Sequence, residues 1–275
     1  MVEQRNTRDV AVMPALPAAG VGSEATRVEQ ARAVAEVAAA VQVAQMTPRD
    51  ERNAWLVMEQ ACRRKGLADR AFYAVKNRGS GPSVHLAREL ARIWGNMDYG
   101  VRETHRDDDL ARSEVLAFAW DQQTNSRTSR SFLVPHVRMA NGARKPLTDV
   151  QDIHLNNTNQ GARALRECIF AIMPADFVAE AQEHCRNTLV NGDGAPLQTR
   201  ITKLVEGFAQ LGVDVPRIEQ RIERKRGQWT ASDVADLTII GGSLKRGETA
   251  VDEAFPPVLT LDMVTASASG VDPSA

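Results

Sequence analysis

The clearest helical periodicity in the chain lies between residues 147 and 174. Apolar side chains recur there at the spacing of one helix face, and polar side chains occupy the opposite face. Thr148 followed by Gln151 is typical of a capping box at a helix start, and Pro174 cannot continue a helix. The pattern therefore predicts one long amphipathic helix. Its apolar face is expected to hold Leu155, Ala162, Leu165, Ile169 and Ile172, and its polar face Asp152, Asn156, Asn159, Gln160, Arg163, Arg166 and Glu167.

Upstream of this helix the hydrophobic period changes to two, which is typical of β-strands. Three stretches show it, at residues 97–104, 113–121 and 128–138, and polar links join them. They predict an antiparallel meander. The middle stretch is apolar on both faces and is expected to be the central strand. The Asn141-Gly142 pair predicts a turn between the third strand and the long helix.

Helical patterns precede the meander. Residues 26–45 are rich in alanine and valine and mildly apolar on every side, which favours burial against a neighbour or another subunit. Residues 47–50 (Thr-Pro-Arg-Asp) predict a helix start, with Thr47 as N-cap and a helix reaching about residue 64, and residues 67–75 fit a short helix or an extended piece. Residues 76–83 form a basic, glycine-rich turn, and Pro82 is expected to begin a helix that runs to Trp94. The turn is interpreted either as a phosphate contact or as an ordinary connector.

Further helical patterns follow the long helix, at residues 176–189, 197–211, 215–224 and 230–244. Thr230 with Asp233 predicts a capping box for the last of them, and the Gly- and Pro-containing stretch 191–196 predicts a linker. The predicted fold class is α+β: an antiparallel β-meander packed on a long amphipathic helix, with N-terminal helices and a small C-terminal helical module. The predicted boundaries are a disordered leader (1–22), the α+β domain (23–190), the linker (191–196), the helical module (197–256) and an acidic disordered tail (257–275).

The net charge of the 275-residue chain is −1, but its charges are segregated. Residues 63–106 hold ten Lys or Arg against four acids, and residues 127–166 hold seven against two. Residues 247–275 hold five acids and no base. A near-neutral total therefore conceals a basic middle and an acidic end, and the basic middle favours a nucleic-acid partner.

The sequence lacks the motifs that are typical of several classes of enzyme. The chain has no P-loop, no zinc-protease helix motif and no nucleophile elbow. The Asp107-Asp108-Asp109 triplet is interpreted as a solvent-exposed hairpin tip, because consecutive residues there do not converge like metal ligands. No catalytic residue, metal or cofactor is therefore expected.

Other features bear on where the protein works. The three cysteines lack metal or disulfide spacing, which favours buried or free thiols in a reducing cytoplasm. No apolar run approaches the length of a membrane span, and the first ten residues lack the apolar core of a signal peptide. An intracellular location without membrane contact is expected.

The polar face of the long helix gives the strongest functional signal. Asn156, Asn157, Thr158 and Asn159 are poor helix formers, so solubility alone is a weak reason for them. Amides beside two arginines one turn apart suit a groove that binds phosphates and sugar edges. The alternative is a solvated face with an incidental run of amides. The candidate DNA-binding residues are Lys76, Arg78, Arg88, Arg92, Arg102, Arg130, Arg138, Arg144, Lys145, Asn156, Asn159, Gln160, Arg163 and Arg166.

Three segments together resemble the phage single-strand annealing proteins of the Erf/RecT/Redβ superfamily, and they cover about residues 45–190. The segments are GPSVHLARELARIWGNMDYGVRE, SEVLAFAWDQQTNSRTSRSFLVPHVR and NTNQGARALRECIFAIMP. In that superfamily, and in the similar eukaryotic ring-forming annealing protein of double-strand-break repair, a helix ending in a glycine-aromatic-asparagine turn precedes a β-meander, and a helix with the motif G-x-K-R-A-L-R follows. Here Trp94-Gly95-Asn96 has that order altered, and residues 161–166 (GARALR) are one residue shorter than the motif.

The resemblance implies that Arg163 and Arg166 line an inner groove for single-stranded DNA. It also implies homo-oligomeric rings or helical filaments, annealing of complementary strands without ATP, and a role in phage recombination in the cytoplasm of a bacterial host. The C-terminal helices resemble the variable tails of these proteins, which contact a host single-strand-binding protein or regulate activity. A phage exonuclease is a further expected partner.

The residues alone leave two other functions open. Asp214 with Glu223 and Lys225 distantly resembles the motif of metal-dependent nucleases, so a nuclease or another recombination enzyme is one alternative. A scaffold protein whose Asn/Arg face meets another protein is the second. Aromatic residues make up only 5% of the chain, so few bases are expected to stack, on Tyr99 or Phe132. Most affinity for DNA would then come from salt-sensitive phosphate contacts.

Overall fold

The computed structural model describes residues 24–75, 79–140 and 143–257. The chain divides into two compact units, Met1–Met46 and Thr47–Ala275. The first contains α1 (Glu24–Met46), close to the helix predicted for residues 26–45. The other described helices and strands belong to the second unit. The predicted leader, and the predicted tail beyond residue 257, lie outside the described residues.

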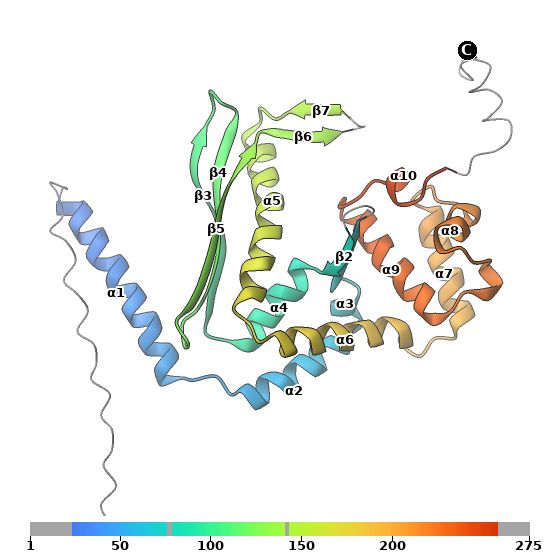
Figure 1. Cartoon of the computed structure of the whole chain (residues 1–275), viewed down its shortest axis with the longest axis horizontal. Helices are drawn as coiled ribbons and strands as arrows, with labels where there is room; N and C mark the ends of the chain where they lie inside the picture. Colours follow the sequence, from blue (N-terminus) through green and yellow to red (C-terminus); the bar gives the residue numbers. More distant parts are fainter. Residues whose placement is uncertain (1–23, 76–78, 141–142, 258–275) are drawn as a thin grey trace, which may run out of the picture. The chain divides into compact units, whose positions relative to one another are not determined.

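A three-stranded antiparallel sheet forms the framework of the second unit (Figure 1). β3 (Met97–Asp107), β4 (Arg112–Asp121) and β5 (Ser126–Pro135) lie side by side in chain order, which confirms the predicted meander with its central apolar strand. The third strand is shorter than predicted. β5 ends at Pro135, and β6 (Val137–Ala140) pairs with β7 (Ala143–Pro146) in a separate hairpin. The predicted Asn141-Gly142 turn lies outside the described residues.

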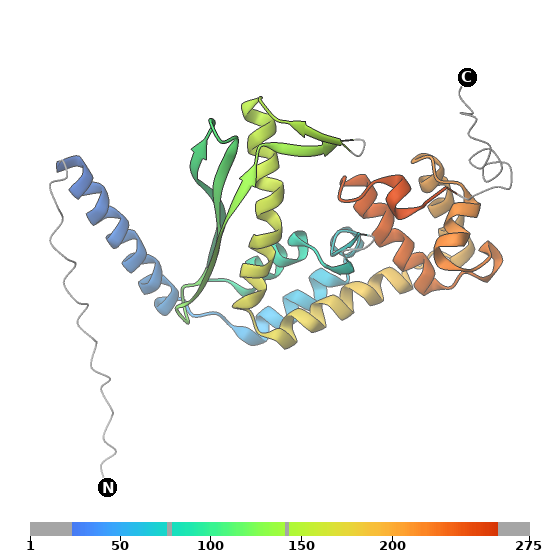
Figure 2. The ribbon, with the colours of Figure 1, turned by 45° about the horizontal axis from the view of Figure 1, so that its top comes forward.

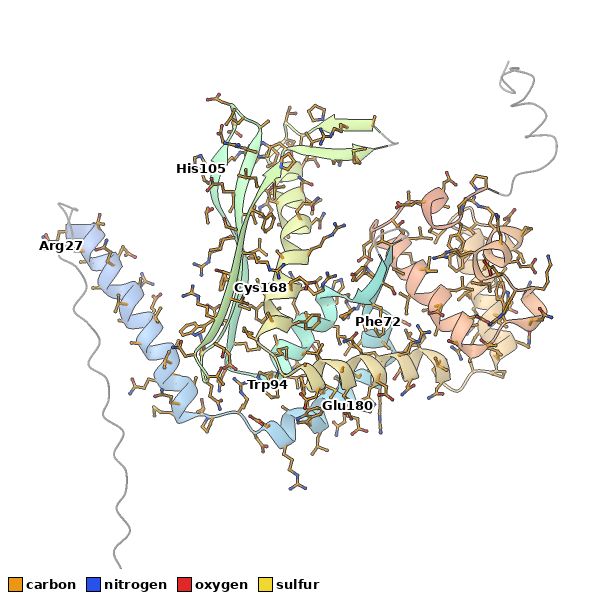
Figure 3. All side chains as sticks on the ribbon, viewed as in Figure 1. Arg27, Phe72, Trp94, His105, Cys168 and Glu180 are labelled. Atoms are coloured by element: carbon orange, nitrogen blue, oxygen red, sulfur yellow. The ribbon has the colours of Figure 1, made fainter. Side chains whose placement is uncertain are left out.

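α5 (Val150–Ala171) runs along one face of this sheet and packs mainly on β4 (Figure 2). Gly161 lies where the helix approaches β3, because a Cβ built on it would be 2.5 Å from Cγ1 of Val101. Any larger residue there would have to displace Val101 or the helix. About two turns further along, the Sγ of Cys168, which is labelled in Figure 3, lies 3.6 Å from the carbonyl oxygen of Ala117. The mixed α+β fold, with the meander packed on the long helix, is as the sequence predicted.

The buried face of α5 differs from the predicted one. Leu155, expected inside, is 57% exposed, whereas Asn157, expected among the surface amides, is 3% exposed. Leu165 and Ile169 are buried as predicted, but the rest of the buried stripe runs through Ile153, Asn157, Gly161 and Cys168. The prediction ranked side chains by polarity, but the sheet selects the stripe that carries Gly161, because only that stripe allows close approach.

The residues that cap the helices also differ from the predicted ones. The carboxylate of Asp149 caps α5 by accepting hydrogen bonds from the amides of Gln151 and Asp152, so the capping box predicted at Thr148 is wrong. α2 (Glu51–Cys62) is capped by Asp50, not Thr47. In both cases an aspartate one to three residues later does the capping, as its short charged side chain allows.

α4 (Val84–Trp94) is capped by Ser83 and begins two residues after Pro82, the predicted first helical position. Pro82 belongs instead to β2 (Gly79–Pro82), which pairs with β1 (Phe72–Val75). Part of the predicted glycine-rich turn is therefore a strand. α2, α3 (Lys65–Ala68), α4 and α6 (Ala175–Asn191) share one apolar core, in which the rings of Trp94 and Phe177 lie 4.9 Å apart.

The C-terminal helices surround a second apolar core that includes Phe208, Trp229 and Phe255. They are α7 (Leu197–Ala209), α8 (Val215–Ile222), a 3-10 turn (Arg226–Gln228), α9 (Ala231–Lys245) and α10 (Val251–Ala254). The capping box predicted at Thr230 and Asp233 is confirmed. α9 contacts α6 and β1, and Arg200 donates hydrogen bonds to the carbonyls of Leu189 and Val190. The predicted linker thus joins helices that contact one another.

Candidate nucleic-acid interface

A groove of about 710 Å³ lies beside the polar face of α5. α5 forms one wall, and β1, the first turns of α4 and the residues after α9 form the other. We refer to it as the central groove. Tertiary folding brings six of the predicted DNA-binding residues to this one surface: Arg88, Asn156, Asn159, Gln160, Arg163 and Arg166.

The hydrogen-bond donors on the α5 wall differ in whether they already have a partner. The Nδ2 of Asn156 donates to the carbonyl of Pro135 at 3.1 Å, so this side chain also ties the wall to the end of β5. Asn159, Gln160 and Arg163 are exposed, and among the described residues none of their side chains has a hydrogen-bond or ion-pair partner. A guanidinium and two amides therefore stand free for a ligand.

Arg166 is held in place more firmly than Arg163. Its side chain is 16% exposed and pairs with Glu167 at 2.7 Å. The guanidinium carbon also lies 4.7 Å from the centre of the Tyr73 ring on the opposite wall. This cation–π contact joins α5 to β1 and covers the tyrosine face. Arg166 therefore positions the two walls as well as adding charge.

The facing wall contributes more cations. Arg88 is exposed, and its side chain has no hydrogen-bond or ion-pair partner within the described ranges. Arg246 donates to the carboxylate of Glu248 at 2.8 Å and to the carbonyl of Phe72 at 2.9 Å, so its charge is largely compensated. Burial, followed by the charges of Arg246, Arg70 and Arg88, lowers the pKa of His85, which sits among them. The groove is therefore an electropositive environment.

Two predicted residues lie on the sheet, outside the central groove. Val101 faces α5, and side chains alternate along a strand, so Arg102 projects from the opposite face. Its guanidinium covers the Phe118 ring at 4.7 Å. Arg130 lies on the edge strand β5, opposite Ala117 of β4. Burial raises the pKa of Cys168, and the charge of Arg130 opposes that rise. A count of basic residues in the sequence does not distinguish arginines on the sheet from arginines in the groove.

Other predicted residues lie on other elements. Arg138, Arg144 and Lys145 belong to the β6–β7 hairpin, where Arg138 lies 3.9 Å from Asp152 at the start of α5. Arg92, on α4, pairs with Glu89 at 2.6 Å. Lys76 and Arg78 fall between β1 and β2 and lie outside the described residues.

Sequence reasoning missed Tyr73, His85 and Arg246 as groove residues. Arg246 follows a helix some 80 residues away from α5, and no local pattern indicates that it meets β1. His85 does carry a signal, because it shares a helix face with Arg88 and Arg92. Tyr73 carries none, since its role depends on the pairing of β1 with β2.

The acidic motifs considered in the sequence have structural roles. Asp107 accepts from the amide of Leu110, and Asp108 pairs with Arg106 at 2.7 Å, as in a closed hairpin tip. Asp214 caps α8, and Lys225 pairs with Glu219. In the described part of the chain, no group of three or more His, Cys, Asp or Glu is arranged to hold a metal ion.

Comparisons with known proteins identify no similar protein. No protein-family model, curated protein or solved structure matches this chain. Within residues 24–75, 79–140 and 143–257, no helix is both long and apolar enough to cross a membrane.

Proposed function

We propose that this protein binds single-stranded DNA in the central groove and anneals complementary strands without ATP, in phage homologous recombination within the bacterial cytoplasm. The observation that carries the proposal is the position of Arg163, an exposed guanidinium without a partner among the described residues, between Asn159, Gln160 and Arg166 on a groove wall. Cations and neutral amides together suit the alternating phosphates and sugars of a nucleic-acid backbone.

The groove suits backbone contact better than base contact. Its one tyrosine, Tyr73, is already covered by the Arg166 guanidinium, so little ring surface is left for a base. A strand held by its phosphates keeps its base edges free, which pairing with a second strand requires. Phosphate contacts are independent of sequence, as general annealing requires.

Annealing of long strands needs several copies of the groove in a row, because one groove of about 710 Å³ holds only a short stretch. The proposal therefore includes homo-oligomerisation as rings or filaments. A host single-strand-binding protein or a phage exonuclease is the proposed additional partner. No step in this function makes or breaks a covalent bond, so no catalytic residue or cofactor is assigned.

The test compares wild-type protein with the Arg163→Ala plus Arg166→Ala variant. Fluorescence anisotropy of a labelled oligothymidylate is measured at about 50 and about 200 mM salt. We expect weaker binding and a slope of log affinity against log salt that is shallower by about 0.7 to 1.4. Each phosphate contact with a single strand contributes about 0.7, and the strand must displace Glu167 to contact Arg166. The control is Arg221→Ala, which removes an exposed charge from α8 outside the groove. Wild-type protein that fails to retard the oligonucleotide in dilute buffer would overturn the proposal.

A further inference from the structure

A second cavity of about 480 Å³ adjoins the central groove. It lies between the α2–α3 corner, α4 and β3, and is lined by Arg64, Arg70, Glu89, Arg92 and Tyr99 together with His85 and Arg88. His85 and Arg88 also line the central groove. They are one turn apart on α4, so the two hollows meet across that helix edge.

The charge in the second cavity is strongly one-sided. Four guanidiniums face a single carboxylate, Glu89, which already pairs with Arg92. Arg64 is exposed, and its side chain has no partner among the residues described here. Arg70 donates only to the carbonyl of Gly66 at 3.2 Å, which leaves its charge uncompensated. An anion entering this cavity would meet three unneutralised cations: Arg64, Arg70 and Arg88.

Titratable groups at the cavity respond to this charge. The hydrogen bond from Arg92 lowers the pKa of Glu89, and the charges of Arg64 and Arg70 lower it further. The charge of Arg70 also reaches His85, on the border with the central groove, where it adds to the lowering of the His85 pKa that burial causes. The charges of the second cavity and of the central groove therefore act on the same residue, which supports one continuous anion path.

We propose that the second cavity is a further subsite for the DNA strand, in which Arg64 and Arg70 bind backbone phosphates after the strand leaves the central groove across His85 and Arg88. This inference rests on the proposed function. Tyr99, half-buried on β3, provides a ring in the same cavity on which one base can stack. Neither Arg64 nor Arg70 belongs to the long helix or the sheet. The DNA strand would therefore contact α5, α4 and the residues around α3.

The test uses the full chain and a series of labelled oligothymidylates from about 4 to about 24 nucleotides, a range that brackets common site sizes. Wild-type affinity is expected to rise with length until both hollows are filled. The Arg64→Ala plus Arg70→Ala variant is expected to bind the shortest oligonucleotides like wild type and to stop gaining affinity at a shorter length. Its salt slope on long oligonucleotides should be shallower by about 1.4.

Arg63→Ala is the matched control, because Arg63 adjoins Arg64, is 69% exposed, pairs with Glu59 and lies outside both hollows. Circular dichroism checks the fold of each variant, and Arg64→Ala alone replaces the double variant if the latter misfolds. An unchanged length dependence and salt slope would overturn the second subsite while leaving the central groove intact. A loss equal at all lengths would place Arg64 and Arg70 in the contact that even the shortest oligonucleotide makes, and would also overturn the second subsite. Wild-type protein that binds no oligonucleotide would overturn the proposed function itself.

Discussion

The central groove and the C-terminal helices both contain several basic side chains, but they use them differently. In the C-terminal helices Arg217 pairs with Asp252 at 2.6 Å, Arg224 with Asp233 at 2.8 Å and Lys225 with Glu219 at 2.9 Å. In the groove, Arg166 and Arg246 are also paired, with Glu167 and Glu248, but Arg88 and Arg163 have no such partner among the described residues. A phosphate can reach an unpaired guanidinium directly, whereas at a paired one it must displace a carboxylate. Unpaired guanidiniums beside the free amides of Asn159 and Gln160, and not the number of cations, therefore mark the candidate interface.

The largest expected effect concerns Gly161, where the α5 wall of the groove packs on the sheet. Gly161→Ala should lower the free energy of unfolding by about 1–3 kcal/mol, because its Cβ would overlap Val101. Gly207→Ala, in α7, is the control: nothing lies within 4 Å of the added Cβ, and alanine favours a helix interior by about 0.5–1 kcal/mol over glycine. Urea unfolding of both variants measures the contrast. A Gly161→Ala protein as stable as wild type would show that α5 does not need this close approach.

The next effect tests paired against unpaired arginine directly. Arg163→Gln should weaken binding of single-stranded DNA by about tenfold in dilute buffer and reduce the salt slope by about 0.7. Arg224→Gln removes the same charge from the C-terminal helices, where it pairs with Asp233, and should change binding by less than about twofold. Anisotropy titrations of both variants give the answer. Equal losses would mean that only total charge matters.

A smaller effect separates stability from binding. Thr230→Ala removes the confirmed capping box of α9 and should lower the free energy of unfolding by about 1 kcal/mol. Thr230 lies outside the lining of both hollows, so DNA affinity should stay unchanged. Thermal melting and anisotropy on the same sample test both statements, and a parallel loss of affinity would tie the C-terminal helices to the groove.

The smallest expected effect is a pH dependence at His85. Burial and the charges of Arg246, Arg70 and Arg88 lower its pKa from 6.5, while Glu248 acts weakly the other way. Its neutral form is therefore favoured in the free protein, and the stability associated with it is lost as pH falls through 6.5. A bound phosphate would favour the protonated form, so DNA affinity should rise about two- to threefold between about pH 7.5 and pH 5.5.

The matched variant is His85→Gln, which should lack this pH-dependent gain while keeping its affinity at the higher pH. Titrations at constant ionic strength measure it, since salt alone changes phosphate binding. The same gain in affinity as pH falls, seen in both proteins, would place the titrating group elsewhere.

The sequence by itself determined the main elements of this protein, but not the short β1–β2 and β6–β7 pairs. The meander with its apolar central strand, the long amphipathic helix and the Thr230 capping box all depend on residues within one or two turns of each other. Local periodicity and capping chemistry suffice for such features. The polar face with Arg163 and Arg166 could also be identified, because charge and helical spacing are local properties.

Only the tertiary structure decided which of these residues meet. Leu155 and Asn157 exchange their expected environments because Gly161 selects the face of α5 that packs on the sheet. Arg102 is directed away from α5 by strand alternation, while Tyr73 and Arg246 join the groove from distant segments. The free energy that fixes these positions comes from packing between elements far apart in the chain, and no local pattern carries that information.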